Sequence, residues 1–157
     1  MRSSANTAQM LYDHLPLDMG ELPDLVGFHL RLAQVALYRD FSASLAELDL
    51  TQKQFAVMEL IQANPGVSQV DLAVTLGTDR ATMMAIVDRL ESRNLLQRER
   101  SSFDRRRQHL HLTDVGRTVL SEAKALVAEH EARFKDRFTP VQVQSLVGML
   151  RALHRQF

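Results

Sequence analysis

Residues 68–113 decide the fold, and they read SQVDLAVTLGTDRATMMAIVDRLESRNLLQRERSSFDRRRQHLHLT. Ser68 can cap a short helix, because its hydroxyl accepts a backbone N–H of the first turn, and Gly77 can end that helix. A second helix begins at Thr78 or Asp79 and ends near Asn94, a residue type that tolerates the left-handed backbone of a helix end. Its apolar residues recur at helical steps and predict one buried stripe, made of Met83, Ile86, Val87 and Leu90.

After these two helices the sequence changes to the alternating pattern of strands. Leu96–Arg100 and Gln108–Thr113 are the predicted strands, and the second alternates leucine with histidine. The segment between them, SSFDRRR, gives the hairpin a basic tip. Two helices joined by a tight turn and followed by an Arg-rich hairpin are the layout of a winged helix-turn-helix. In that layout one helix enters the DNA major groove, and the hairpin, or wing, reaches the flanking backbone or the minor groove.

The flanking segments predict further helices. Residues 24–48 form a long amphipathic helix after a loosely ordered arm, residues 1–23. Capping signals open the other helices: Thr51 with Gln54, Thr113, and Thr139 before Pro140. The expected fold class is therefore mainly α with a small β-hairpin wing. We expect one intertwined domain, in which residues 49–113 form the DNA-binding region and residues 24–48 and 114–157 form dimerisation helices.

Composition excludes several classes of protein. The chain has 157 residues with 19 basic and 19 acidic side chains, but residues 98–117 alone hold six basic groups against three acidic ones. With no Cys, there is no thiol redox site, zinc finger or iron–sulfur cluster. The sequence also lacks the short motifs of common enzyme classes, so we expect no catalytic activity and no cofactor. No membrane segment or secretion signal is apparent, which favours a cytoplasmic protein that joins the nucleoid when bound to DNA.

Two groups of residues are predicted to contact double-stranded DNA. On the second helix the side chains that face away from the buried stripe offer a guanidinium for guanine, hydroxyls for phosphate and methyl groups for thymine. On the wing, arginines supply phosphate contacts, and Asp104 holds Arg106 in place. The predicted contacts are Thr78, Arg80, Ala81, Thr82, Met84, Ala85 and Arg89 on the helix and Arg98, Arg105, Arg106 and Arg107 on the wing. The alternative is an ordinary solvated helix surface and turn.

At this point the sequence resembles the MarR family of dimeric winged-helix regulators. The residues that carry the resemblance are 50–55, 68–73, 87–91, 104–107 and 112–116, in this order and spacing. By the resemblance, Asp104 and Arg106 match the wing pair of the family, and residues 78–89 match its recognition helix. The family usually has Gly where this chain has Asn94. The resemblance also implies dimerisation through the terminal helices, and the many leucines of these helices agree with such an interface. A two-fold symmetric dimer would require a pseudo-palindromic operator.

The same resemblance implies a small-molecule effector that releases DNA, often a phenolic or aromatic acid, and here the acid or its thioester. Candidate ligand contacts on the long first helix are His29, Arg31, Tyr38 and Arg39, and ordinary surface or interhelical hydrogen bonds are the alternative for each. The overall expectation is a homodimeric, ligand-responsive transcriptional regulator that acts as a repressor. Two other classes stay open: a metal-responsive regulator, for which His109 and His111 supply only two ligands, and a protein-docking module with a basic hairpin.

Overall fold

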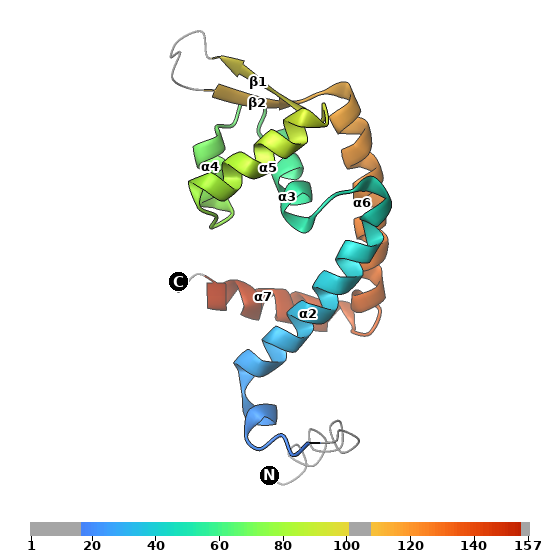
Figure 1. Cartoon of the computed structure of the whole chain (residues 1–157). Coiled ribbons are helices and arrows are strands. Elements are labelled where there is room, and N and C mark those ends of the chain that lie inside the picture. Colours follow the sequence, from blue (N-terminus) through green and yellow to red (C-terminus); the bar gives the residue numbers. More distant parts are fainter. Residues whose placement is uncertain (1–16, 101–107, 155–157) are drawn as a thin grey trace. The chain divides into compact units, whose positions relative to one another are not determined.

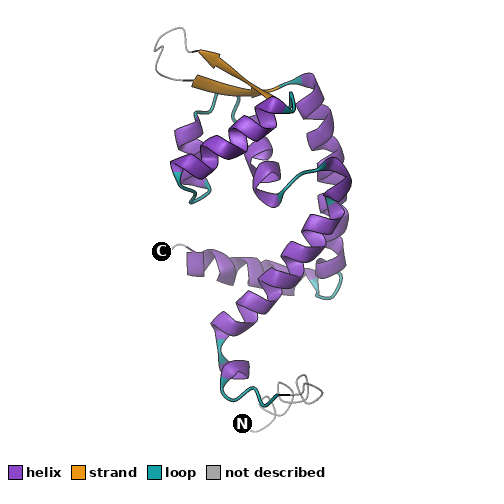
Figure 2. Cartoon of the chain, in the orientation of Figure 1, coloured by secondary structure: helices purple, strands orange, loops and turns teal. Residues whose placement is uncertain are grey.

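The computed structural model describes residues 17–100 and 108–154, and the chain divides into two compact units, Met1–Asp40 and Phe41–Phe157. In the first unit, the short 3₁₀ helix η1 (Leu22–Asp24) precedes α2 (Val26–Ser44), whose last residues belong to the second unit. The second unit holds the 3₁₀ helix η2 (Ala46–Leu48), α3 (Gln52–Ala63), α4 (Gln69–Thr75), α5 (Arg80–Ser92), β1 (Leu96–Arg100), β2 (Gln108–Leu112), α6 (Asp114–Lys135) and α7 (Pro140–His154). The fold is mainly α with one hairpin, as expected (Figures 1 and 2).

The predicted caps are in place. The Thr51 hydroxyl accepts the Gln54 backbone N–H, and the Gln54 side chain accepts the Thr51 N–H in return. The Ser68 hydroxyl accepts the Asp71 N–H at the start of α4, and the Thr113 hydroxyl accepts the Gly116 N–H at the start of α6. At the end of α5, Asn94 has the left-handed backbone that the sequence predicted, with φ of 57°. Local sequence signals therefore set most of the helix boundaries.

One predicted helix is shorter than expected. The periodic pattern predicts a continuous helix over residues 24–48, but α2 ends at Ser44 and the chain then turns through η2. Leu45 and Leu50, on either side of this turn, are 0% and 5% exposed. Asp49 between them adopts a left-handed backbone with φ of 46°. Burial of the two leucines thus decides where the helix stops. The turn that follows is not predicted by helical periodicity.

The hairpin is attached to the helices along one edge. β1 and β2 pair antiparallel, with Leu96 opposite Leu112 and Arg98 opposite Leu110. Leu110 also exchanges backbone hydrogen bonds with the loop before α4, because it donates to the Val67 carbonyl and accepts from the Gly66 N–H. Leu96 and Leu110 are both 1% exposed. The base of the wing is therefore part of the core of the second unit.

The core of the second unit is apolar and is built from α3, α4, α5, both strands and α6. The predicted stripe of α5 faces it: Met83, Val87 and Leu90 are 0% exposed, and Ile86 is partly buried against them. Because one face of α5 is fixed in this way, the opposite face is turned to solvent.

Candidate nucleic-acid interface

The N-terminus of α5 is held by Asp79. One carboxylate oxygen accepts the Thr82 backbone N–H at 2.9 Å, and the other accepts the Thr82 hydroxyl at 2.6 Å. These hydrogen bonds, first that of the hydroxyl and then that of the backbone, lower the pKa of Asp79 below its ordinary value. Asp79 thus begins the helix, and it also orients Thr82, one of the predicted DNA contacts.

The solvent face of α5 carries the other predicted contacts. Arg80, Ala81, Met84 and Ala85 are exposed, with Met84 at 52%, whereas Thr78 and Thr82 are half-buried. An exposed thioether next to two alanines is unusual on a helix turned only to water. The arrangement offers a cation, a hydroxyl and methyl groups on one accessible face, which is the set of groups that base edges in a major groove accept.

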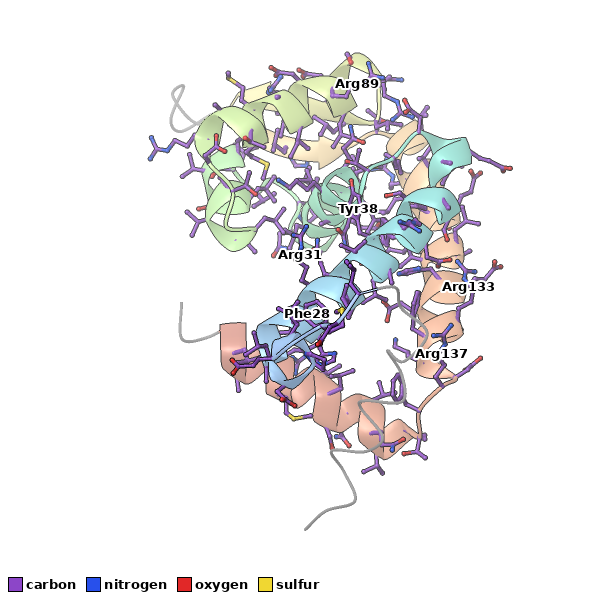
Figure 3. All side chains as sticks on the ribbon, turned by 60° about the horizontal axis from the view of Figure 1, so that its bottom comes forward. Phe28, Arg31, Tyr38, Arg89, Arg133 and Arg137 are labelled. Carbon is purple, nitrogen blue, oxygen red and sulfur yellow. The ribbon has the colours of Figure 1, made fainter. Side chains whose placement is uncertain are left out.

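The C-terminal half of α5 is tied to the linker that follows η2. Arg89 lies 3.3 Å from the Asp49 carboxylate, and its side chain stays 60% exposed (Figure 3). Arg93 donates to the backbone carbonyl of Leu48 at 2.8 Å and also to the carbonyl of Asp49. Sequence reasoning did not single out Asp49, because its partners lie 40 residues or more away along the chain. Arg89 therefore keeps an exposed guanidinium, which pairs with Asp49 at the surface.

Arg98 lies at the base of the wing, and both of its terminal nitrogens are paired. One is 2.5 Å from the Asp88 carboxylate, and the other donates to Glu91. Its side chain is only 18% exposed. The sequence grouped Arg98 with the DNA-contacting arginines, but here its guanidinium is turned to α5 and engaged by two carboxylates of that helix.

Several predicted site residues lie outside the described part of the chain. Asp104, Arg105, Arg106 and Arg107 belong to this group, so their roles stay predictions. The histidines of β2 are described: His109 shares a 2.6 Å hydrogen bond with the Gly66 carbonyl, and His111 lies 3.6 Å from the Glu99 carboxylate. Within residues 17–100 and 108–154, no three His, Asp or Glu side chains gather as a metal site would require. None of the helices in these ranges is long and apolar enough to cross a membrane.

The predicted effector contacts are all on α2. His29 shares a 2.7 Å hydrogen bond with the Pro23 carbonyl, so it fastens the entry to the helix. Arg31, Tyr38 and Arg39 are exposed, with Tyr38 at 49%. Figure 3 labels Arg31 and Tyr38 on α2. As ligand contacts, these four residues stay predictions.

Two arginines near the end of α6 were not singled out by the sequence. Arg133 donates a 2.6 Å hydrogen bond to the Ser44 hydroxyl, and Arg137 lies 5.7 Å from the ring of Phe134 (Figure 3). In the sequence these two arginines are marked only by their spacing of four residues, and that spacing does not predict a binding site.

Comparison with known proteins agrees with this geometry. A model of the MarR family matches residues 48–107. A protein of Thauera aromatica, named as a candidate transcriptional regulator of the hcr operon, is 33% identical over 138 residues, which is 87% of this chain and 83% of that protein. The solved structure of the transcriptional repressor CouR bound to a 23-mer DNA duplex is 42% identical, with a TM-score of 0.85, and covers 88% of this chain and 98% of that one. CouR bound to p-coumaroyl-CoA is 42% identical, with a TM-score of 0.83, and covers 90% of this chain and 99% of that one.

A capped recognition helix with an exposed polar and methyl face, followed by a hairpin, defines a winged helix-turn-helix DNA-binding protein. Together with the sequence matches, this places the chain among transcriptional regulators rather than enzymes. The chain belongs to the MarR family.

Proposed function

We propose that this protein is a homodimeric repressor that leaves a pseudo-palindromic operator when the coenzyme A thioester of an aromatic acid binds. The observation that carries the proposal is the 42% identity over nearly the whole chain to CouR, solved both with DNA and with p-coumaroyl-CoA. A second CouR, from Rhodococcus jostii RHA1, is also solved with p-coumaroyl-CoA, at 27% identity and a TM-score of 0.77. The cytoplasm, where DNA and coenzyme A thioesters are both present, is the compartment that this function requires.

The proposed DNA contacts follow from the exposed face of α5. Arg80, Ala81, Met84 and Ala85 lie on that face. Two further contacts are Thr82, which Asp79 holds by a hydrogen bond, and Arg89, which pairs with Asp49. The wing tip, with Arg105, Arg106 and Arg107 and with Asp104 holding Arg106, supplies the backbone or minor-groove contacts. Two such surfaces on a symmetric pair of chains would meet half-sites about 10 base pairs apart.

The proposed dimer interface involves α2 and α7. Both helices carry exposed leucines and valines, among them Leu30 at 39% and Val141 at 70%. Apolar surface of this extent on a protein that binds a symmetric site favours a second copy of the chain as its cover.

The experiment is a DNA-binding titration with matched ligands. A duplex selected from a random-sequence pool is bound by the purified protein and followed by fluorescence anisotropy, and p-coumaroyl-CoA, free p-coumarate and coenzyme A are then added separately. We expect the thioester to release DNA at a lower concentration than either of its parts. Release by free p-coumarate alone would shift the proposal to the acid as effector. If the selection yields no duplex that the protein binds, the proposed function is overturned.

Arginine variants separate the two proposed modes of DNA contact. Arg106→Ala should weaken binding to all duplexes and reduce the slope of log K against log salt by about 0.9 for each phosphate that the side chain neutralises. Arg80→Ala should instead weaken the selected duplex by about 1–3 kcal/mol and leave random DNA nearly unchanged. An equal reduction on selected and random DNA would show that Arg80 does not read a base.

A further inference from the structure

The direction of Arg98 follows from strand pairing. Arg98 lies opposite Leu110 in the hairpin, and residues directly opposite each other share one face of a sheet. Leu110 is 1% exposed, so this face is turned to the helices, while Gln97 and Glu99 on the other face are exposed. The side chain of Arg98 therefore points from the wing toward α5.

On α5, Arg98 meets a pair of carboxylates at the right spacing. Asp88 and Glu91 are three residues apart, so they lie on the same side of the helix. Each binds a different terminal nitrogen of the guanidinium, which forms a fork that a lysine could not make. The fork joins the middle of β1 to the last turns of the recognition helix.

Charge alone does not account for these carboxylates. Two carboxylates and one guanidinium leave a net charge of −1, and Asp88 remains 55% exposed on the helix that we propose enters DNA. A negative group near phosphates weakens binding. The carboxylates must therefore contribute something other than attraction to DNA, and the geometry points to alignment of the wing.

We propose that Arg98 is a positioning residue for DNA binding: by gripping Asp88 and Glu91 it sets the angle between wing and recognition helix, so that both reach one duplex together. The turn between α5 and β1 fixes the start of β1, through the Leu95 N–H bound to the Leu90 carbonyl and the Thr113 hydroxyl bound to the Asn94 carbonyl. Farther along the hairpin, Leu110 of β2 is bound to the loop before α4, and Arg98, directly opposite Leu110, ties β1 to α5. This inference rests on the proposed DNA interface.

The decisive variant is the double substitution Asp88→Asn with Glu91→Gln. It removes two negative charges from the DNA-facing side, so electrostatics alone, or a direct phosphate contact by a released Arg98, would make binding tighter. Positioning gives the opposite sign: we expect binding of the selected duplex to weaken by about tenfold, because side chains that must act together fail together. Arg98→Gln should weaken binding by a similar factor, and the triple variant should bind little more weakly than either.

Controls keep folding and function apart. Arg117→Gln breaks another arginine pairing, with Asp114 and the Leu112 carbonyl, at the start of α6, and it should leave DNA affinity within about twofold. Urea unfolding confirms that each variant is folded under the assay conditions, and the single Asp88→Asn and Glu91→Gln variants should each show a smaller reduction in affinity. In hydroxyl-radical footprints, Arg98→Gln and the double variant should lose the protection of flanking DNA by the wing and keep the protection by the recognition helix.

The outcomes distinguish this inference from the function on which it rests. If the wild-type protein binds no selected duplex, the proposed function fails. If the wild type binds and the double variant binds equally well or more tightly, Arg98 is not a positioning residue. Unchanged wing protection in Arg98→Gln would overturn the inference in the same way.

Discussion

The winged region, residues 49–113, and helix α7 are both rich in apolar residues, but they bury them to different extents. In the winged region Met83, Val87 and Leu90 are completely buried by their own chain. In α7, by contrast, none of residues 140–153 is buried, and Val141 and Met149 are 70% and 60% exposed. The DNA-binding part therefore completes its own core, whereas the C-terminal helix keeps an exposed apolar surface, as the proposed dimer interface requires.

The largest expected effect comes from placing charge on the apolar face of α7. Leu146 and Leu150 are four residues apart, on one face of the helix, and are 42% and 41% exposed. Burial of a leucine side chain contributes about 1.5–3 kcal/mol, and in a symmetric dimer each substitution acts twice. Leu146→Glu with Leu150→Glu should therefore convert the proposed dimer to monomer, as measured by analytical ultracentrifugation.

The matched control for this charge is Gln144→Glu, on the opposite side of α7. It should leave the dimer intact. The thermal midpoint of the wild type should rise with protein concentration, and that of the double variant should not. A double variant that stays dimeric would mean that the exposed face of α7 is not the dimer interface, so a partner chain would not explain why its apolar residues are exposed.

The next effect is expected at a glycine of α6 that packs on the winged region. A Cβ at Gly116 would lie 1.8 Å from the backbone carbonyl oxygen of Leu95, which cannot rotate away as a side chain could. Gly116→Ala should destabilise the fold by at least the roughly 1–3 kcal/mol that is typical of overpacking. Urea unfolding measures the change, and a stabilised variant would show that α6 and the α5–β1 turn are not in contact.

Sequence periodicity and caps account for most of the fold. The exposed face of α5 follows from its stripe, and the turn at Asn94 follows from residue type, so Arg80 and Met84 could be placed on the accessible side without a structure. The end of α2 could not, because it is decided by the burial of Leu45 in a core made by distant helices. Local signals are strong when a residue acts within its own turn and weak when packing overrides them.

The candidate site shows the same division. The direction of Arg98 depends on its pairing with Leu110, and its partners depend on how β1 meets α5. The role of Asp49 depends on an arginine 40 residues away. A count of arginines in the hairpin predicts a basic wing, but it cannot tell which arginine is paired within the protein.

A smaller effect, of opposite sign, is expected at the glycine of α7. No heavy atom lies within 4 Å of a Cβ built at Gly148, and the residue is on the side of the helix away from Leu146 and Leu150. Since alanine favours the helical backbone by about 0.8–1.0 kcal/mol over glycine, Gly148→Ala should stabilise the protein by up to that amount. Chemical unfolding of this variant beside Gly116→Ala gives a direct contrast, and destabilisation would indicate that a partner chain packs closely on this side too.

The smallest effect separates the caps of the two regions by pH. Helix α5 begins on the Asp79 carboxylate, whereas α7 begins on a neutral pair, in which the Thr139 hydroxyl accepts the Gln142 N–H and the Gln142 side chain accepts the Thr139 N–H. The pKa of Asp79 is lowered in the folded protein, chiefly by the Thr82 hydroxyl and then by the Thr82 N–H. A carboxyl with a depressed pKa stabilises the fold fully above its unfolded pKa of about 3.9, and that contribution is lost as the pH falls through the lower folded value.

Asp79→Asn isolates this contribution, because asparagine caps a helix about as well as aspartate but does not titrate. We expect the free energy of unfolding of the wild type to exceed that of Asp79→Asn at neutral pH, and the difference to shrink as the solution is acidified below the ordinary range of aspartate. Thr139→Ala should lower the free energy of unfolding by the same amount at neutral and at acidic pH, because neither member of that cap changes charge. If the difference between wild type and Asp79→Asn did not vary with pH, the Asp79 carboxylate would not be the group that holds the start of the recognition helix.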